Sequence, residues 1–511
     1  MKKKRGEKRV KSKIIFPNSP LIIRYLLFVI LFSSFFILRF SVAQDFDFSD
    51  TDSWEISASN QLEYSLDKKN HQDIFHNWLD FNWTHDLYNV GLRYEAHQPD
   101  DRGKTYQELS YRYFELSPEF LTLTVGNYYA MFGRGLILRS YENRDLRHDD
   151  NLEGVKGTID LDGFDLTLLG GTPRGKYERI NDPLHGVDGK IAFFEWMTLG
   201  GSYLRTNITD FGFVRLYGGN AGLTFPHLDL YGEYARKDNP PGKYIEKDGD
   251  GIYLSSNLYY SGFGLSVEYK DYERFEFINK DVTYNNPPSL TKEHLYTLLN
   301  RHAYILNLYD EKGLQIQTTS TPHEKLSLSA NFSHTTDHKG KSWWPYGHGE
   351  MIFSEIYGEM EYDYKDLATI KGAFSRMENK REEGSPYYLA PVFDLTYYLS
   401  GQTSLIFLLE HLWTNKYDGK LTYYDQIISL GLSHSPFISL TFTHERTTEW
   451  KTKDWSGKKR WFIVTLDLLM GEKHNLSLSI GSRRAGKVCS GGVCTDRPAL
   501  DGGEIKLLSQ F

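Results

Sequence analysis

The chain has 511 residues, of which 40% are hydrophobic and 15% aromatic, yet its mean hydropathy is −0.50. Residues 1–43 hold ten of the 59 Lys and Arg residues and one of the 67 acidic residues, so the remainder carries 49 basic and 66 acidic side chains, a net charge of −17. So acidic a body argues against nucleic acid as a partner, because phosphates require basic patches, and it suits cations. No apolar run of about eighteen residues follows residue 43, which excludes a transmembrane helix there.

The first 43 residues have the three parts of a secretory signal peptide. Basic residues crowd positions 2–13, residues 25–38 are almost purely apolar, and small residues precede a cleavage site between Ala43 and Gln44. A transmembrane anchor over 21–40 is the alternative, but it would have to carry two arginines. We therefore expect a signal peptide over 1–43 and a single β-barrel domain over 44–511.

Strand-like segments of about ten residues recur along the rest of the chain, and this is the length that a tilted strand needs to cross a bilayer. We predict twenty-four strands, within a range of 20 to 26, in an all-β fold: a single transmembrane antiparallel up-and-down β-barrel. The strands are predicted to start near residues 54, 76, 87, 105, 119, 152, 163, 186, 197, 214, 227, 250, 262, 311, 324, 351, 366, 387, 403, 421, 436, 459, 473 and 500.

The faces of these strands alternate between apolar and polar. In one of them the two faces are Leu326, Leu328, Ala330 and Phe332 against Ser327, Ser329, Asn331 and Ser333. A period of two is expected when one face meets lipid and the other a wet lumen. A half-exposed soluble sheet shows the same period, so the loops have to decide between the two.

Short and long connections take turns along the chain, with eleven short turns and twelve long loops. A soluble sandwich has no reason to sort loop lengths in this way. Twenty-four strands that start and end on the periplasmic side of an outer membrane require this pattern. We therefore expect an outer-membrane location with both termini periplasmic.

The last strand places Ile505, Leu507 and Phe511 on one face. A terminal aromatic residue on an amphipathic strand resembles the signal by which the barrel assembly machinery recognises outer-membrane barrels. We interpret these three residues as the insertion signal, and the assembly machinery and the membrane lipid as partners.

Two stretches resemble an uncharacterised family of outer-membrane β-barrel proteins of Bacteroidota-like bacteria. One is residues 126–154, which contain Phe132-Gly133-Arg134-Gly135. The other is residues 481–494, which contain both cysteines. The resemblance covers nearly the whole chain after the leader. It implies the fold and the membrane, and it brings no assigned activity.

The third long loop, residues 129–151, mixes glycines, an apolar run at 136–138 and charges of both signs. An apolar run is badly placed in an exposed loop, so we expect the loop to fold into the lumen and to form a constriction that selects solutes. A structural ion-pair cluster is an equally weighted alternative. The constriction residues are predicted to be Arg134, Arg139, Glu142, Arg144, Asp145, Arg147, Asp149 and Asp150.

The seventh long loop, about 273–310, is longer than a simple link requires. It contains Pro287-Pro288, and residues 290–300 are compatible with a short helix. We expect an ordered lid or partner surface here.

Cys489 and Cys494 are the only cysteines, and in an exported chain they predict one disulfide. A free or redox-active pair is the alternative. A metal site is disfavoured because no further ligand lies close by in the sequence. No cofactor or metal is therefore expected.

No catalytic group can be assembled from the sequence, so we do not expect an enzyme. The preferred function is a porin-like channel or transporter for small polar or cationic solutes. The alternative is a closed barrel that serves as a surface binding or assembly component, with a secretion or adhesion partner.

Overall fold

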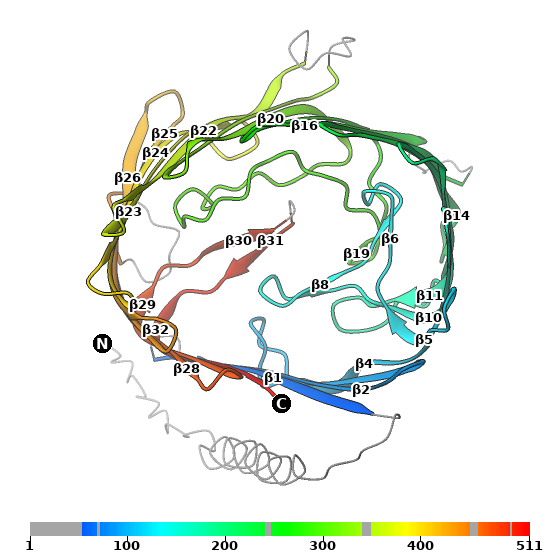
Figure 1. Cartoon of the computed structure of the whole chain (residues 1–511), viewed down its shortest axis with the longest axis horizontal. Coiled ribbons are helices and arrows are strands. Elements are labelled where there is room, and N and C mark those ends of the chain that lie inside the picture. The colour runs from blue at the N-terminus through cyan, green and yellow to red at the C-terminus, as the bar shows by residue number, and fades with distance from the viewer. Residues whose placement is uncertain (1–53, 69–71, 241–246, 340–348, 450–457, 491–492) are drawn as a thin grey trace, which may run out of the picture. The chain divides into compact units, whose positions relative to one another are not determined.

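A computed structural model describes residues 54–68, 72–240, 247–339, 349–449, 458–490 and 493–511. Within it, Glu55–Gln510 form one unit, an antiparallel sheet of 24 strands. Each strand pairs with its neighbours along the chain and the last pairs with the first, so the sheet closes into the ring of Figure 1. The predicted fold class and strand number are confirmed. The predicted signal peptide and its cleavage site lie outside the described residues.

The first half of the wall consists of β1 (Glu55–Asp67), β2 (Gln72–His85), β3 (Tyr88–His97), β4 (Tyr106–Leu116), β5 (Leu121–Tyr128), β10 (Leu152–Leu161), β11 (Phe164–Pro173), β12 (Leu184–Phe194), β13 (Met197–Ile208), β14 (Gly212–Phe225), β15 (Leu228–Asp238) and β16 (Gly249–Tyr260). The second half consists of β17 (Phe263–Glu273), β20 (Asp310–His323), β21 (Leu326–Thr336), β22 (Met351–Tyr364), β23 (Ala368–Asn379), β24 (Tyr387–Tyr398), β25 (Thr403–Lys416), β26 (Leu421–His434), β27 (Ile438–Thr447), β28 (Arg460–Met470), β29 (His474–Arg483) and β32 (Leu500–Gln510). All begin within four residues of the predicted starts.

The barrel closes where β1 meets β32. Ser59 is opposite Gln510 and Leu62 is opposite Leu507, in an antiparallel register that continues to Asp67. The first residues of β1 and the last residues of β32 therefore lie at the rim that carries the short turns.

The wall is polar inside and apolar outside. In β21, Asn331 and Ser333 are buried, while Leu328 on the opposite face is exposed. Exposed large apolar side chains recur on the outer face of the other wall strands, for example Phe442 and Leu430. Burying one such side chain stabilises a protein by about 1.5–3 kcal/mol, so an outer face of this composition is suited to hydrocarbon and not to water.

Exposed aromatic rings gather near the short turns. Phe194 stacks on Trp196 with ring centroids 5.2 Å apart, and Trp196 stacks on Phe225 at 5.9 Å. Tyr259 and Tyr260 are exposed at the end of β16. Amphipathic rings of this kind form the interfacial girdles of membrane barrels. Among the described residues, no helix is both long and apolar enough to cross a membrane.

Candidate functional site

Among the connections that turn into the interior of the barrel are two loops and a hairpin (Figure 1). Inner loop 1 comprises residues 129–151, with the short strands β6 (Met131–Phe132), β7 (Leu138–Arg139), β8 (Glu142–Asn143) and β9 (His148–Asp149). Inner loop 2 comprises residues 274–309, with β18 (Ile278–Asn279) and β19 (Val282–Thr283). The inner hairpin consists of β30 (Gly486–Ser490) and β31 (Val493–Arg497).

The apolar run anchors inner loop 1 to the wall. The exposed fraction of Leu136, Ile137 and Leu138 is at most 1%, and they belong to a cluster with apolar residues of β11–β17 and inner loop 2. Gly133 and Gly135, with φ of +58° and +87°, form the tight turn before the run. The positive φ of Gly133 favours glycine, and a Cβ there would also lie 2.2 Å from the Glu233 carboxylate and displace it. The loop therefore lies inside the barrel, as its sequence predicts.

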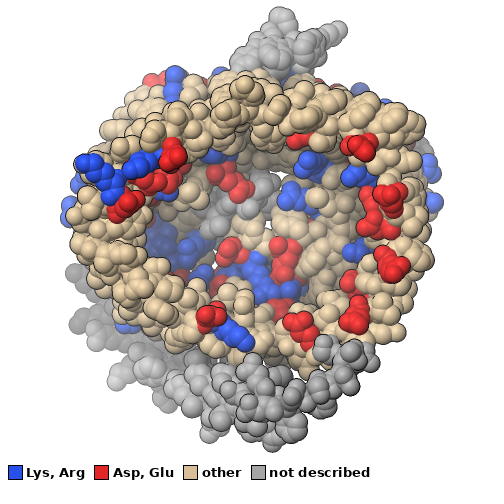
Figure 2. Space-filling model, viewed as in Figure 1, with Lys and Arg blue, Asp and Glu red and all other residues tan. Residues whose placement is uncertain are grey.

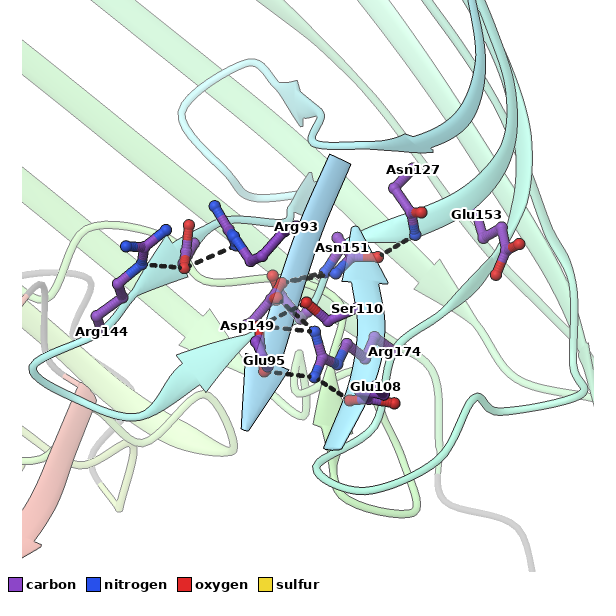
Figure 3. A network of polar contacts seen from close by, with 12 residues as sticks. Arg93, Glu95, Glu108, Ser110, Asn127, Arg144, Asp149, Asn151, Glu153 and Arg174 are labelled. Carbon is purple, nitrogen blue, oxygen red and sulfur yellow. Dashed lines mark hydrogen bonds and ion pairs between the residues drawn. The ribbon is translucent and has the colours of Figure 1, made fainter. Parts of the chain in front are cut away.

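The β8–β9 hairpin is tied to the wall by an ionic quartet, Asp80, Arg93, Glu142 and Arg144. Figure 3 shows the two arginines of the quartet. Arg144 reaches Asp80 at 2.7 Å and Glu142 at 2.8 Å. Arg93 reaches the same two carboxylates, at 2.5 and 2.8 Å. Each charge of the quartet thus meets two opposite charges, one from the wall and one from the hairpin.

Arg147 forms a second anchor for the hairpin. Its guanidinium lies 2.6 Å from Glu63 and 3.1 Å from Asp101, and it stands over the Trp78 ring. Burial alone would raise the pKa of the Asp101 carboxyl, but its hydrogen bond with His76 and the charge of Arg147 hold the pKa well below its usual range. Asp101 is therefore ionised and its bond to the hairpin is a charged one.

Arg174, just after β11, was not predicted from the sequence. Its guanidinium lies 2.6 Å from Glu108, 2.9 Å from Asp149 and 3.1 Å from Glu95 (Figure 3). It holds β9 against β3 and β4. The sequence gives no signal for this residue, because its partners lie far away along the chain.

The other predicted constriction residues lie in different surroundings. Arg134 is exposed above the Tyr231 ring, and Arg139 reaches the Asn286 carbonyl. Asp145 is exposed and the structure gives it no ion pair among the described residues. Asp150 is buried and accepts a hydrogen bond from the Tyr141 amide. Only part of the predicted set therefore gathers around the quartet.

Two cavities lie on either side of the quartet along β1–β5. The loop-side cavity, of about 620 Å³, reaches toward the long loops and is lined by residues that include Glu142, Arg144, His97 and Arg497. The turn-side cavity, of about 470 Å³, reaches toward the short turns and is lined by residues that include Asp80, Arg93, Asn82, Glu115 and Lys156. The quartet contributes two residues to each cavity and so lies at the boundary of both.

Inner loop 2 fills the opposite side of the interior. Its residues Tyr296, Leu298, Leu299 and Tyr304 are buried in a cluster with β22–β26. Arg301 lies 3.1 Å from Asp425 and 2.8 Å from Glu445 on the wall. The loop is thus docked by apolar contacts and by charge.

The helix considered for residues 290–300 is not formed: residues 290–294 have no regular structure, and residues 295–300 form bends and a turn. The Leu298 amide donates to Glu410 and the His294 amide to the Asn300 side chain, so polar side chains take the donors that a helix would use.

The backbone of the inner hairpin places Cys489 directly opposite Cys494. The side chains of both cysteines lie outside the described residues. Directly opposite residues in an antiparallel pair have Cα atoms about 4.5–5.5 Å apart, which is within the range that a disulfide spans. The disulfide stays a prediction that this register favours.

The fold defines a transmembrane-type β-barrel with inward loops. The chain belongs to a family of unknown function, DUF6029, whose model matches residues 24–511. No curated protein matches the chain.

Several solved barrels are similar to the chain. The P pilus usher (PapC) translocation pore has 9% identity and a TM-score of 0.45, over 90% of this chain and 98% of the other. The siderophore receptor PirA from Pseudomonas aeruginosa has 9% identity and a TM-score of 0.42, over 90% and 81%. OccK3 (OpdO) from Pseudomonas aeruginosa has 12% identity and a TM-score of 0.42, over 64% and 90%. At these identities the likeness concerns the fold alone.

Proposed function

We propose that the protein is an outer-membrane channel for small polar solutes, with the ionic quartet as its constriction. The observation that carries this proposal is the pair of cavities along β1–β5, each of which is lined by two residues of the quartet. Side chains that meet across a path restrict it by size and by charge. The polar interior and the apolar outer face support a location in the outer membrane. The alternation of short turns and long loops supports a periplasmic side for the short turns and for both chain termini.

The charges on the cavity walls favour polar solutes in general over strictly cationic ones. Seven acidic and six basic residues line the loop-side cavity, and two of each line the turn-side cavity. Figure 2 shows charges of both signs interspersed around and inside the mouth of the barrel. The acidic excess of the whole chain is therefore not concentrated along the proposed path.

The test is to measure the single-channel current of the purified protein in planar bilayers, for the wild type and for two variants of the quartet. Arg144→Ala removes one cation and leaves Asp80 and Glu142 with one partner fewer, so we expect a larger conductance and a shift of the reversal potential toward cation preference. Glu142→Gln weakens the carboxylate side, so we expect the shift toward anions.

Lys420→Ala is the matched control, because it removes an exposed cation in the turn between β25 and β26. Stepwise conductance in wild type with opposite shifts in the two variants supports the proposal. Equal reversal potentials in wild type and both variants would show that the quartet does not lie on the conducting path.

A closed barrel that binds a partner through its loops is the second candidate. The observation in its favour is the docking of inner loop 2, which occupies one side of the interior by apolar contacts and ion pairs. Under this proposal wild type carries no current, and Arg301→Met, which undocks the loop, opens a current.

A further inference from the structure

Two histidines of the loop-side cavity meet side chain to side chain. His76 on β2 and His97 on β3 are opposite each other in the sheet, and their Nδ1 atoms are 2.5 Å apart. Both residues are nearly inaccessible, with exposed fractions of 2% and 3%. They line the loop-side cavity together with Trp78 and Tyr106, whose rings pack against theirs.

The outer nitrogens of both rings point to carboxylates. Nε2 of His76 lies 3.4 Å from Asp101, and Nε2 of His97 lies 3.4 Å from Glu95. Each of these carboxylates also pairs with a cation, Asp101 with Arg147 and Glu95 with Arg174, both at 3.1 Å.

With the proton of each ring on Nε2, toward its carboxylate, the two Nδ1 atoms present lone pairs to each other. Lone pairs at this distance repel unless a cation lies between them.

We propose that His76 and His97 bind a divalent transition-metal ion through their Nδ1 atoms. Imidazole suits Zn²⁺, Cu²⁺ and Ni²⁺, and histidine ligands almost always donate their other N–H to a carboxylate or carbonyl. Here a carboxylate lies 3.4 Å from each Nε2. With metal–nitrogen bonds of about 2.0–2.1 Å in a tetrahedral shell, the two Nδ1 atoms would move apart by roughly 0.8 Å.

Both imidazoles line the loop-side cavity. Among the described residues no group of three or more His, Cys, Asp or Glu side chains is arranged to hold a metal, so the two imidazoles are the only protein ligands. Water or a solute in the cavity completes the shell. An ion held in this way exchanges with the cavity, unlike an ion in a closed structural site with four protein ligands.

The test is titration of the purified barrel with CuCl₂ and ZnCl₂, followed by calorimetry and, for Cu²⁺, by electron paramagnetic resonance. We expect one ion per barrel and a spectrum with two imidazole nitrogens in wild type. His97→Asn should lose the site. Asp101→Asn keeps both ligands but removes a carboxylate behind one of them, so we expect affinity to fall 10- to 100-fold.

His294→Gln is the control, because His294 is also buried against a carboxylate, Glu355, but has no histidine beside it. It should bind the ion as wild type does. The proposal would be overturned if the wild-type protein bound no more metal than folded His97→Asn. A proton shared between the two Nδ1 atoms would then account for their short distance. Heat-dependent migration on gels checks that each variant is folded.

Discussion

His338 bridges two wall strands from the loop that follows β21. Its Nε2 and Nδ1 each lie 2.7 Å from a carboxylate, Asp271 on β17 and Asp310 on β20. Burial lowers the pKa of His338, but the hydrogen bonds and charges of the two aspartates outweigh it and raise the pKa above 6.5. A raised folded-state pKa adds stability that is complete below the unfolded value and is lost as pH rises through the folded one.

We therefore expect His338→Gln to lower the free energy of unfolding more at pH 5.5 than at pH 8.5, measured by denaturant unfolding in detergent. His227→Gln, an exposed histidine in the turn before β15, should show no such dependence. An equal loss at both pH values would mean that the two aspartates do not hold a charged imidazole.

At this scale the sequence predicts which side chains carry charge into the lumen but not what they meet. Arg144 and Arg147 are predicted because they sit in an unusual loop. Their wall partners Asp80 and Glu63 are ordinary inward residues of a period-two pattern. Arg174 is missed altogether, because its contacts with Glu95 and Glu108 join positions 79 and 66 residues apart.

Arg301 is the arginine that docks inner loop 2, beside the His294–Glu355 and His302–Glu382 pairs. It contacts both Asp425 and Glu445, and Arg484, which follows β29, also lies 3.0 Å from Asp425. Removing one partner of a buried pair typically costs about 3–5 kcal/mol, because the other charge is left uncompensated. Arg301→Met should therefore undock residues 290–308 while the wall stays closed.

Hydrogen exchange measures this directly. Amides of inner loop 2 should lose protection in Arg301→Met, and amides of β22–β26 should keep theirs. Lys380→Met, an exposed position after β23, is the control. Loss of protection in the wall as well would show that the loop is part of the barrel's own stability.

Elements are predicted well where their signal is local. Strand starts follow from alternation and turns, and the inward course of inner loop 1 follows from its apolar run. The structure of residues 290–300 could not be predicted from the local sequence, because the Leu298 amide donates a hydrogen bond to Glu410, which is more than a hundred residues away.

At the scale of the whole molecule, the barrel wall is stable only if its outer face lies in hydrocarbon. Leu430 is 54% exposed in the middle of the apolar face of β26, opposite Phe407 and Phe442 of the neighbouring strands. An arginine near the bilayer midplane costs about 2–4 kcal/mol.

Leu430→Arg should lower the free energy of unfolding in lipid vesicles by that amount. Leu295→Arg, at an 87% exposed position of inner loop 2, should have little effect. Equal stabilities of Leu430→Arg and wild type would place this face outside the hydrocarbon.

The seam between β1 and β32 links assembly to the interior. Glu63 of β1 accepts from Arg147 of the β8–β9 hairpin and lies 3.6 Å from Lys506 of β32. Thr495 and Arg497 of the inner hairpin line the same cavity as His76. Segments from both ends of the polypeptide therefore line the loop-side cavity. The cavity forms only when β32 pairs with β1. An unclosed barrel in the course of insertion has no such chamber, so any selective passage through it begins with closure.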